Sequence, residues 1–344
     1  MEPGAAVARW MRCRTGAWAE GEGEGEGEGG RRDLWSGQVW GRGRVPAVLA
    51  VPAAGLMVFH RAVPNSVGHL GSLLEAFLPW LGLVVVVLFV VAVLRRSAVA
   101  LVVLLLPVAA WTSLFGGLLE AEHGSHDLVV VQHNVSDENT DPVGTARVLA
   151  GAGPDLIALE ELVPPASAVY AQALGPDYPY HVVRGTVGLW SKHPLSGARQ
   201  VDIRPRQITE SWSRALRAVV HTPRGDVAVY VAHLPSVRFR ASGFASSWRD
   251  ESAGLLGEAV AVEKLKKVLL LGDLNGTVDD RGLTPLTSRM NTAERGFAFS
   301  FPAAFPVARI DQVMARSATV GHIRTLPATG SDHLPVAARI TGVF

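Results

Sequence analysis

The segment Val268-Leu269-Leu270-Leu271-Gly272-Asp273-Leu274-Asn275-Gly276-Thr277 sets the architecture that we expect for the surrounding chain. An apolar run ends in a glycine, and a carboxylate and an amide follow two positions apart, which predicts a buried strand leading into a loop. Because residues i and i+2 of an extended chain point to the same side, Asp273 and Asn275 are expected to face one site. The same two side chains could instead only hydrogen-bond the turn. The rest of the chain has to distinguish these interpretations.

Composition bounds the class of protein. The chain has 344 residues, which is enough for one large domain or two ordinary ones. A net charge of +1 indicates neither a basic nucleic-acid-binding body nor an acidic tail, although a local basic groove is compatible with it. With 48% hydrophobic and 18% charged residues, the chain is expected to contain membrane segments. The single cysteine, Cys13, excludes an intrachain disulfide and a cysteine-based metal site.

The N-terminal part divides into a polar tail and apolar stretches. Residues 1–44 include Gly21–Gly30, where glycine alternates with glutamate, and are expected to form a disordered cytoplasmic tail. A helix needs roughly 20 apolar residues to cross a bilayer. On that basis residues 45–119 are predicted to form three transmembrane helices, at about 45–63, 73–94 and 98–119. The first is the weakest candidate because it contains Pro46 and Pro52.

Arginine placement predicts the orientation. The tail is rich in arginine, and Arg95-Arg96 separates the second and third apolar stretches. By the positive-inside rule both would be cytoplasmic. Three crossings would then place residues 126–344 outside the cell membrane, as the extracytoplasmic domain of a multi-pass protein.

Residues 126–344 have the pattern of an α/β domain. Strands are expected at 127–131, 155–159, 216–220, 227–232, 268–271, 308–315 and 335–340, with helices at 142–152 and 250–262. Polar residues follow several of these strands: Asn134, Glu161, His233, Asp273, Asn275, Asp311, Asp332 and His333. Taken singly, each could be an ordinary turn or rim residue. Together, at loops carried by a rigid sheet, they are typical of a catalytic centre.

The residue types indicate metal-assisted phosphoester chemistry. Mg²⁺ prefers oxygen ligands and keeps several waters, so one or two carboxylates suffice to bind it. The sequence contains neither a Gly-x-Ser-x-Gly elbow nor a Walker-type glycine loop, which disfavours serine hydrolases and nucleotide hydrolases.

Several motifs in order then resemble those of the endonuclease/exonuclease/phosphatase superfamily, which includes pancreatic-type deoxyribonuclease, abasic-site endonucleases, sphingomyelinases and inositol-phosphate 5-phosphatases. The resemblance covers about residues 126–344, and the apolar N-terminal part resembles that of membrane-anchored actinobacterial members. The motifs are Val130-Val131-Gln132-His133-Asn134-Val135, Pro154-Asp155-Leu156-Ile157-Ala158-Leu159-Glu160-Glu161, Ala232-His233-Leu234, Gly272-Asp273-Leu274-Asn275, Arg309-Ile310-Asp311-Gln312-Val313 and Ser331-Asp332-His333-Leu334-Pro335-Val336.

The resemblance implies a fold and a metal site. The fold would be a four-layer α/β sandwich, with two packed mixed sheets flanked by helices. Glu161 would bind Mg²⁺, or Mn²⁺, with Asn134 close by and Asp332 contributing. Two positions depart from the family pattern: Glu160 stands where many members have Gln, and Ser136 stands where some nucleases have a second metal-binding Asp.

The resemblance also implies catalytic roles. Asp273 would orient or activate the attacking water, and Asn275 would stabilise the pentacovalent phosphorane. His333, oriented by Asp311, would act as a general base or a transition-state stabiliser. His233 would donate a hydrogen bond to a phosphate oxygen.

The sequence therefore favours a membrane-anchored, metal-dependent phosphoester hydrolase. Its substrate could be nucleic acid, a phospholipid or a small phosphoester. A phosphate-binding groove could be formed by Arg204, Arg206, Arg214, Arg217, Arg238 and Arg240. The lipid bilayer is the other expected partner, and no protein partner is indicated. The alternative is a non-catalytic membrane receptor or scaffold that retains the fold, because fold alone does not guarantee activity.

Overall fold

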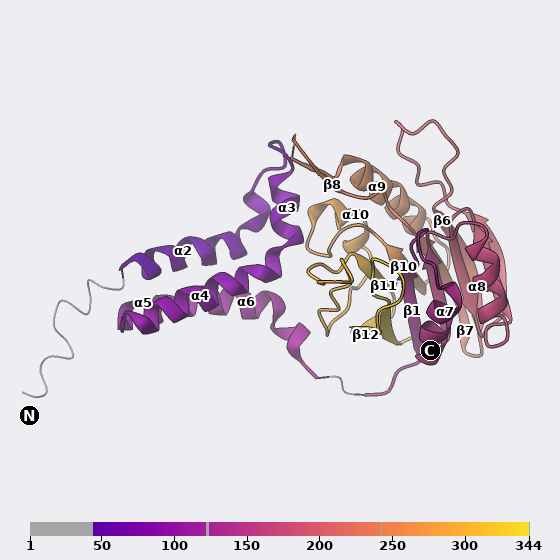
Figure 1. The fold of residues 1–344 in the computed structure, drawn as a ribbon, viewed down its shortest axis with the longest axis horizontal. Coiled ribbons are helices and arrows are strands. Elements are labelled where there is room, and N and C mark those ends of the chain that lie inside the picture. The colour runs from indigo at the N-terminus through magenta and orange to yellow at the C-terminus, as the bar shows by residue number, and fades with distance from the viewer. Residues whose placement is uncertain (1–43, 122–123, 242, 344) are drawn as a thin grey trace, which may run out of the picture.

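The computed structural model describes residues 44–121, 124–241 and 243–343. A helical arm projects from an α/β domain (Figure 1). Apart from residue 44, the predicted N-terminal tail lies outside the described residues.

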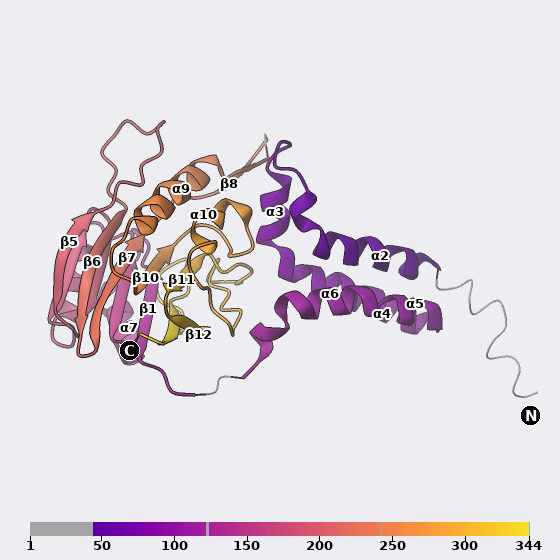
Figure 2. The same cartoon turned by 180° about the vertical axis from the view of Figure 1, so that it is seen from behind.

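The arm consists of three helical runs that lie side by side in both views (Figures 1 and 2). Its buried seam includes Ala50, Met57, Leu88, Leu104 and Ala110, so each run contributes apolar side chains to the contact. The elements of the arm are α2 (Arg44–Val58), η2 (His60–Ala62), α3 (Leu70–Ala76), η3 (Leu78–Trp80), α4 (Leu81–Leu94), α5 (Ala98–Val103), α6 (Leu105–Phe115) and η4 (Gly116–Leu119).

The prediction of three transmembrane helices, and of a multi-pass protein, is wrong. Among the described residues one helix is long and apolar enough to cross a membrane, namely Ala98–Leu119 with 22 residues. Leu70–Ala76 and Leu78–Leu94 are bent by 67° and would make a second crossing only as one broken span, while Arg44–Val58 is shorter. The bend follows from Pro79 in the first turn of η3, because proline lacks the N–H that would continue the preceding helix.

Two mixed sheets form the body of the domain. The six-stranded sheet has the order β12-β13-β1-β2-β4-β3, and the five-stranded sheet has the order β11-β10-β7-β6-β5. Within them β1 pairs with β2, and β10 with β7, in parallel. The strands of the six-stranded sheet are β1 (Leu128–Asn134), β2 (Leu156–Glu160), β3 (Tyr180–Arg184), β4 (Val187–Ser191), β12 (Thr319–Thr325) and β13 (Val336–Thr341). Those of the five-stranded sheet are β5 (Leu195–Gln200), β6 (Ala215–Thr222), β7 (Gly225–Ala232), β10 (Val268–Asp273) and β11 (Asp311–Arg316).

The sheets pack face to face and carry helices on their outer faces. Val130 lies in the core between the sheets, whereas its neighbour Val131 packs under the helices, as the alternation of strand side chains requires. The helices are α7 (Pro142–Gly151) and α8 (Ala166–Leu174) on one side, and α9 (Ser247–Ala261) and α10 (Thr284–Thr287) on the other. The predicted α/β sandwich of two mixed sheets with helices is thus confirmed.

Most of the expected elements are present, with ends that differ by a few residues. For example, the strand expected at 308–315 begins only at Asp311. Strands β3, β4, β5 and β12 were not predicted, and neither was the hairpin of β8 (Arg238–Arg240) and β9 (Gly243–Ala245).

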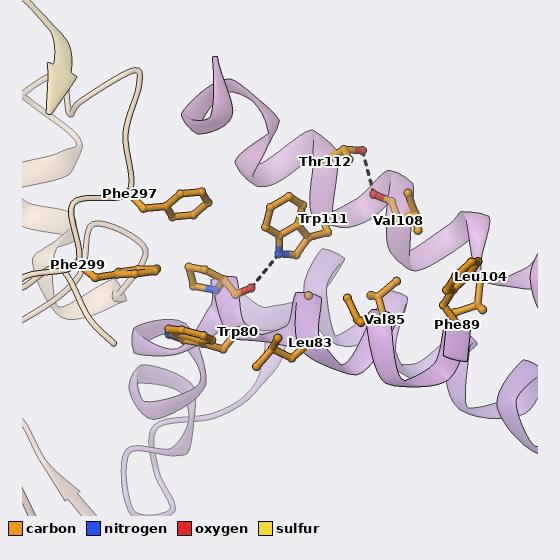
Figure 3. A pocket seen from close by; sticks show the side chains of 13 residues that line it. Trp80, Leu83, Val85, Phe89, Leu104, Val108, Trp111, Thr112, Phe297 and Phe299 are labelled. Atoms are coloured by element: carbon orange, nitrogen blue, oxygen red, sulfur yellow. Dashed lines mark hydrogen bonds between the residues drawn. The ribbon is translucent and has the colours of Figure 1, made fainter. Parts of the chain in front are cut away.

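The arm contacts the domain through aromatic rings and one buried ion pair. Trp80 stacks on Phe299 with ring centroids 5.4 Å apart, and Trp111 faces Phe297 at 6.3 Å (Figure 3). The carboxylate of Glu75, fully buried, accepts hydrogen bonds from the guanidinium of Arg281, whose Nε and Nη2 both lie at 2.8 Å. The arm is therefore fastened to the loop that follows β10.

Candidate active site

Strand ends from both sheets converge on one edge of the sandwich. Asn134 ends β1 and is aligned with Glu160 at the end of β2, while Asp273 ends β10 and pairs with Asp311 at the start of β11. Gly272 lets the end of β10 lie close to the end of β7, because a Cβ at this position would lie 1.9 Å from the Ala232 carbonyl oxygen.

His333 and Asp311 form a buried ion pair. The Nδ1 of His333 lies 2.8 Å from Oδ2 of Asp311, which also accepts a hydrogen bond from Ser300 Oγ at 2.5 Å. Burial alone would lower the pKa of His333, but the charges of Asp311 and Asp273 outweigh it and raise that pKa to about 10. Burial opposes ionisation of Asp311 as well, yet His333 holds its pKa below the ordinary value. The imidazole is therefore a cation at neutral pH.

Asp273 lies at the centre of the cluster. Its Oδ2 accepts a hydrogen bond from Asn134 Nδ2 at 3.1 Å and lies 3.7 Å from His233 Nε2 and 3.8 Å from His333 Nε2. Burial raises the pKa of Asp273 to about 7, although the neighbouring His333 favours the ionised form. A carboxyl with a pKa near neutrality can accept a proton during a reaction.

Asn275 serves the turn and the site together. Its backbone N–H donates to Asp273 Oδ1 at 2.9 Å, and its side-chain amide donates to the Leu234 carbonyl at 2.9 Å. Its φ of 47° lies in the left-handed region that asparagine tolerates better than most residues. The two interpretations of the opening motif are thus compatible with each other.

Glu161 and the buried His233 lie next to each other on the side of the cluster where Glu161 reaches solvent. Asn134 Nδ2 donates to Glu161 Oε1 at 3.0 Å, and that oxygen lies 3.7 Å from His233 Nε2. His233 is buried, and neither ring nitrogen has a hydrogen-bond partner in the structure. Burial lowers its pKa to about 3, so the ring is neutral with one unpaired N–H. An unpaired buried donor beside a carboxylate is what a ligand oxygen would satisfy.

The adjacent residues Glu160 and Glu161 differ sharply in environment. Glu160 is fully buried and accepts a hydrogen bond from Gln132 Nε2 at 2.8 Å, and burial raises its pKa well above the ordinary value. The Glu161 side chain is 29% exposed and faces Asn134 and His233. Glu160 is therefore enclosed by the protein, and Glu161 is the carboxylate that remains accessible at the cluster.

Two overlapping sets of side chains could bind a metal, the first of them with all three ligands only if His333 gives up its proton. Asp273, Asp311 and His333 place ligand atoms within 4.8 Å of one another, and they form the metal-compatible group of His, Cys and acidic residues in the described part of the chain. Glu161 and Asn134 adjoin this group through Asp273. The carboxylate oxygens of these residues suit Mg²⁺, whereas Asn134 turns its Nδ2 toward them. The predicted ligand Asp332 is exposed and does not belong to the group.

Some contributors to the site were not predicted. Gln132 donates to both Glu160 and Asp311, and its position two residues before Asn134 could have indicated that both face the same side. Ser300 gave no such signal, because it contacts Asp311 from an irregular loop.

The predicted arginine groove forms only in part. Arg214, Arg238 and Arg240 line one pocket of about 530 Å³ together with Trp212 and Trp248. Arg214 lies over the Trp212 ring at 4.2 Å. The other predicted arginines are engaged elsewhere: Arg217 pairs with Glu263, Arg206 with Glu251, and Arg204 with the Glu210 carbonyl.

Comparison with known proteins supports the fold and the family. The model of the Endonuclease/Exonuclease/phosphatase family matches residues 131–333. A solved endonuclease/exonuclease/phosphatase from Beutenbergia cavernae superposes with a TM-score of 0.50 at 19% identity, covering 63% of this chain and 72% of its own. A double mutant of beta toxin from Staphylococcus aureus with bound magnesium ions has a TM-score of 0.50 at 16% identity, covering 62% and 99%. No curated protein matches the sequence.

Proposed function

Because this chain belongs to the endonuclease/exonuclease/phosphatase family, whose members are metal-dependent phosphoesterases, we propose that it hydrolyses phosphoesters with a divalent metal ion. The observation that carries the proposal is the buried His333–Asp311 ion pair, at 2.8 Å, beside Asp273. The pair holds His333 as a cation 3.8 Å from the proton acceptor Asp273, which is an arrangement suited to moving protons at a phosphoester.

The residues present fit Mg²⁺, with Mn²⁺ as the alternative. Glu161 would hold the ion, with Asn134 beside it, and the unpaired buried N–H of His233 could donate to an oxygen of the bound phosphoester. When bound, the ion would offset the charge that develops on the phosphoryl group.

The side chains would divide the chemistry between them. Asp273 would accept the proton of the attacking water, since its pKa of about 7 suits a base at neutral pH. His333 would act as a cationic stabiliser and proton donor rather than as a base, because Asp311 keeps it protonated. Neutral His233 would donate its N–H to a phosphoryl oxygen. Asn275 would hold Asp273 in place through its backbone N–H, and it would also stabilise the phosphorane.

We also propose that the chain is anchored in a membrane by Ala98–Leu119. This helix has the required length and begins with α5 at the far end of the arm (Figure 1), and Arg95-Arg96 comes just before α5 in the sequence. By the positive-inside rule the arginines would face the cytoplasm and the domain the opposite side.

The test uses the full chain in detergent on chromogenic phosphodiesters and phosphomonoesters, with Mg²⁺ and with a chelator. We expect metal-dependent hydrolysis that His333→Asn lowers by about two to four orders of magnitude. His126→Asn, which changes an exposed histidine, is the matched control. Equal rates for wild type and His333→Asn on every substrate would refute catalysis and favour the receptor or scaffold.

A further inference from the structure

A cavity of about 570 Å³ lies between the arm and the domain. Its walls come from α4, α6 and the loop that carries Phe297 and Phe299 (Figure 3). Its lining side chains are hydrocarbon or aromatic except for Thr112. A cavity of this size commonly holds a small ligand.

The polar atoms of the lining side chains are already bonded. Trp80 Nε1 donates to the Val307 carbonyl at 2.6 Å, and Trp111 Nε1 donates to the Pro79 carbonyl at 2.8 Å. Thr112 Oγ1 donates to its own helix at 2.9 Å. A polar ligand would find no hydrogen-bond partner among these side chains and would lose those it has in water. The occupant must therefore be hydrocarbon.

The shape of the cavity selects an elongated chain. It runs along the arm from Phe89 and Leu104 at one end to Phe297 and Phe299 at the domain (Figure 3). Val86, which lines it, is also 57% exposed, so the cavity is continuous with the apolar outer face of α4. An acyl chain of a lipid bilayer lies parallel to a spanning helix in this way, with its head group at the end where the helix leaves the membrane.

The domain end of the cavity adjoins the catalytic pair. Phe299 is followed by Ser300, which donates to Asp311 at 2.5 Å, and by Phe301, whose ring centroid lies 4.8 Å from that of His333. The head group of a lipid held in the cavity would therefore lie beside the loop that borders the active site.

We propose that the cavity binds one acyl chain of a membrane phospholipid and that the substrate of the active site is a lipid phosphoester taken from the bilayer. This inference rests on the proposed hydrolase and on anchoring of the arm. In the reaction the oxygen of water would bond to phosphorus, one phosphorus–oxygen ester bond would break, and the leaving oxygen would take a proton.

The test compares two substitutions on the same helix, Val86→Trp and Val87→Trp. Both valines are well exposed, at 57% and 60%, but only Val86 lines the cavity. The full chain is reconstituted in vesicles of phosphatidylcholine and phosphatidylglycerol containing a phospholipid with a photoreactive acyl chain. Val86→Trp should lower lipid hydrolysis and the yield of the photo-adduct by about tenfold or more, while Val87→Trp matches wild type.

A soluble chromogenic phosphodiester is the third readout, and Val86→Trp should hydrolyse it as wild type does. Val108→Trp, which fills the cavity from α6, is the second filling variant should Val86→Trp fail to fold.

Three results would overturn the inference. One is equal lipid hydrolysis and photo-adduct yield in the filling and control variants. Another is a wild type that gives no lipid adduct and is a dimer in detergent, which would assign the cavity to a second copy. The third is hydrolysis by wild type of the soluble diester or of a single-stranded oligonucleotide but not of lipid, which would leave the proposed hydrolase intact. If wild type shows no metal-dependent activity on any substrate, the proposed hydrolase is refuted instead. The photo-adduct would then still show whether the cavity binds an acyl chain.

Discussion

Glu75→Ala is expected to loosen the arm from the catalytic domain. The Glu75 carboxylate is fully buried and accepts hydrogen bonds from the backbone N of Arg281 at 2.9 Å and from its Nε and Nη2 at 2.8 Å. Breaking a buried ion pair by removing one partner typically costs about 3–5 kcal/mol. The Arg281 side chain is 24% exposed and keeps bonds to the carbonyls of Val63 and His60, so the lower end, about 3 kcal/mol, applies here.

The same substitution should reduce activity, because the arm connects to the active-site loop. Arg281 follows Asp280, whose carboxylate accepts from Arg249 Nη2 at 2.6 Å. Arg249 Nη1 in turn donates to the Asn275 carbonyl at 3.1 Å. A loss of about 3 kcal/mol shifts the docked-to-undocked ratio by roughly 100-fold. We therefore expect kcat to fall while KM changes little.

The assay is thermal unfolding in detergent together with hydrolysis of a soluble phosphodiester. About 3 kcal/mol corresponds to a lowering of Tm by roughly 6–12 °C in a domain of this size. Glu120→Ala is the matched control, because Glu120 is 64% exposed and pairs with Arg295 at 3.4 Å. Equal Tm and kcat in the two variants would refute the reasoning.

Further predictions concern the metal and two ion pairs. A chelator should abolish hydrolysis, and added Mg²⁺ should restore it. Glu161→Gln should need about tenfold more Mg²⁺ than wild type for half-maximal hydrolysis, whereas Glu138→Gln, at an exposed glutamate, should need the same amount as wild type. Asp311 helps to raise the pKa of His333 to about 10, so His333 is protonated below that pH. Without this carboxylate His333 would lose its proton at lower pH, so the kcat of Asp311→Asn should fall as pH rises above about 6.5. A pH–rate profile identical in shape to that of wild type would contradict this prediction. Burial opposes ionisation of Glu263, but hydrogen bonds led by that from Arg217 outweigh it and lower its pKa to about 2. The stability that ionised Glu263 contributes is therefore present above its ordinary pKa and is lost as pH falls toward 2. Glu263→Gln should lower the free energy of unfolding by about 3 kcal/mol at pH 7, and denaturant titrations should show that this free energy depends less on acid pH in the variant than in wild type.

The sequence predicted most central strands and missed three of the four edge strands of the two large sheets, β3, β5 and β12; it also missed the buried β4, whose run is interrupted by Gly188. Residues 156–160 are buried throughout, as expected for a central strand with a sheet on one face and helices on the other. Strand β5, Leu195–Gln200, is mostly exposed at a sheet edge, contains Gly197 and pairs with β6 through an irregular register. Edge strands bury one face at most, so their sequences lack the signal that identified the central strands.

The spans were predicted wrongly because composition does not encode where a helix bends. Residues 73–94 are apolar enough to cross a membrane, but the helix is interrupted after Ala76. The bend begins at Pro79, and the buried carboxylate just before it, Glu75, has its partner Arg281 206 residues away in the sequence. No local pattern could reveal that contact.

The motif at 272–275 shows why a site can be found where local structure alone is ambiguous. Asp273 uses Oδ1 to accept the N–H of Asn275 at 2.9 Å, which shapes the turn. Its Oδ2 faces Asn134 at 3.1 Å and lies within 3.8 Å of His233 and His333. One oxygen thus fixes the orientation of the other, so the turn bond would support the proposed catalytic role of Asp273 and does not compete with it. Asp273→Asn would keep the turn only if its amide oxygen replaced Oδ1, and its NH₂ would then face the donor Asn134. For this reason the substitution should disturb Asn134 as well as remove the proton acceptor.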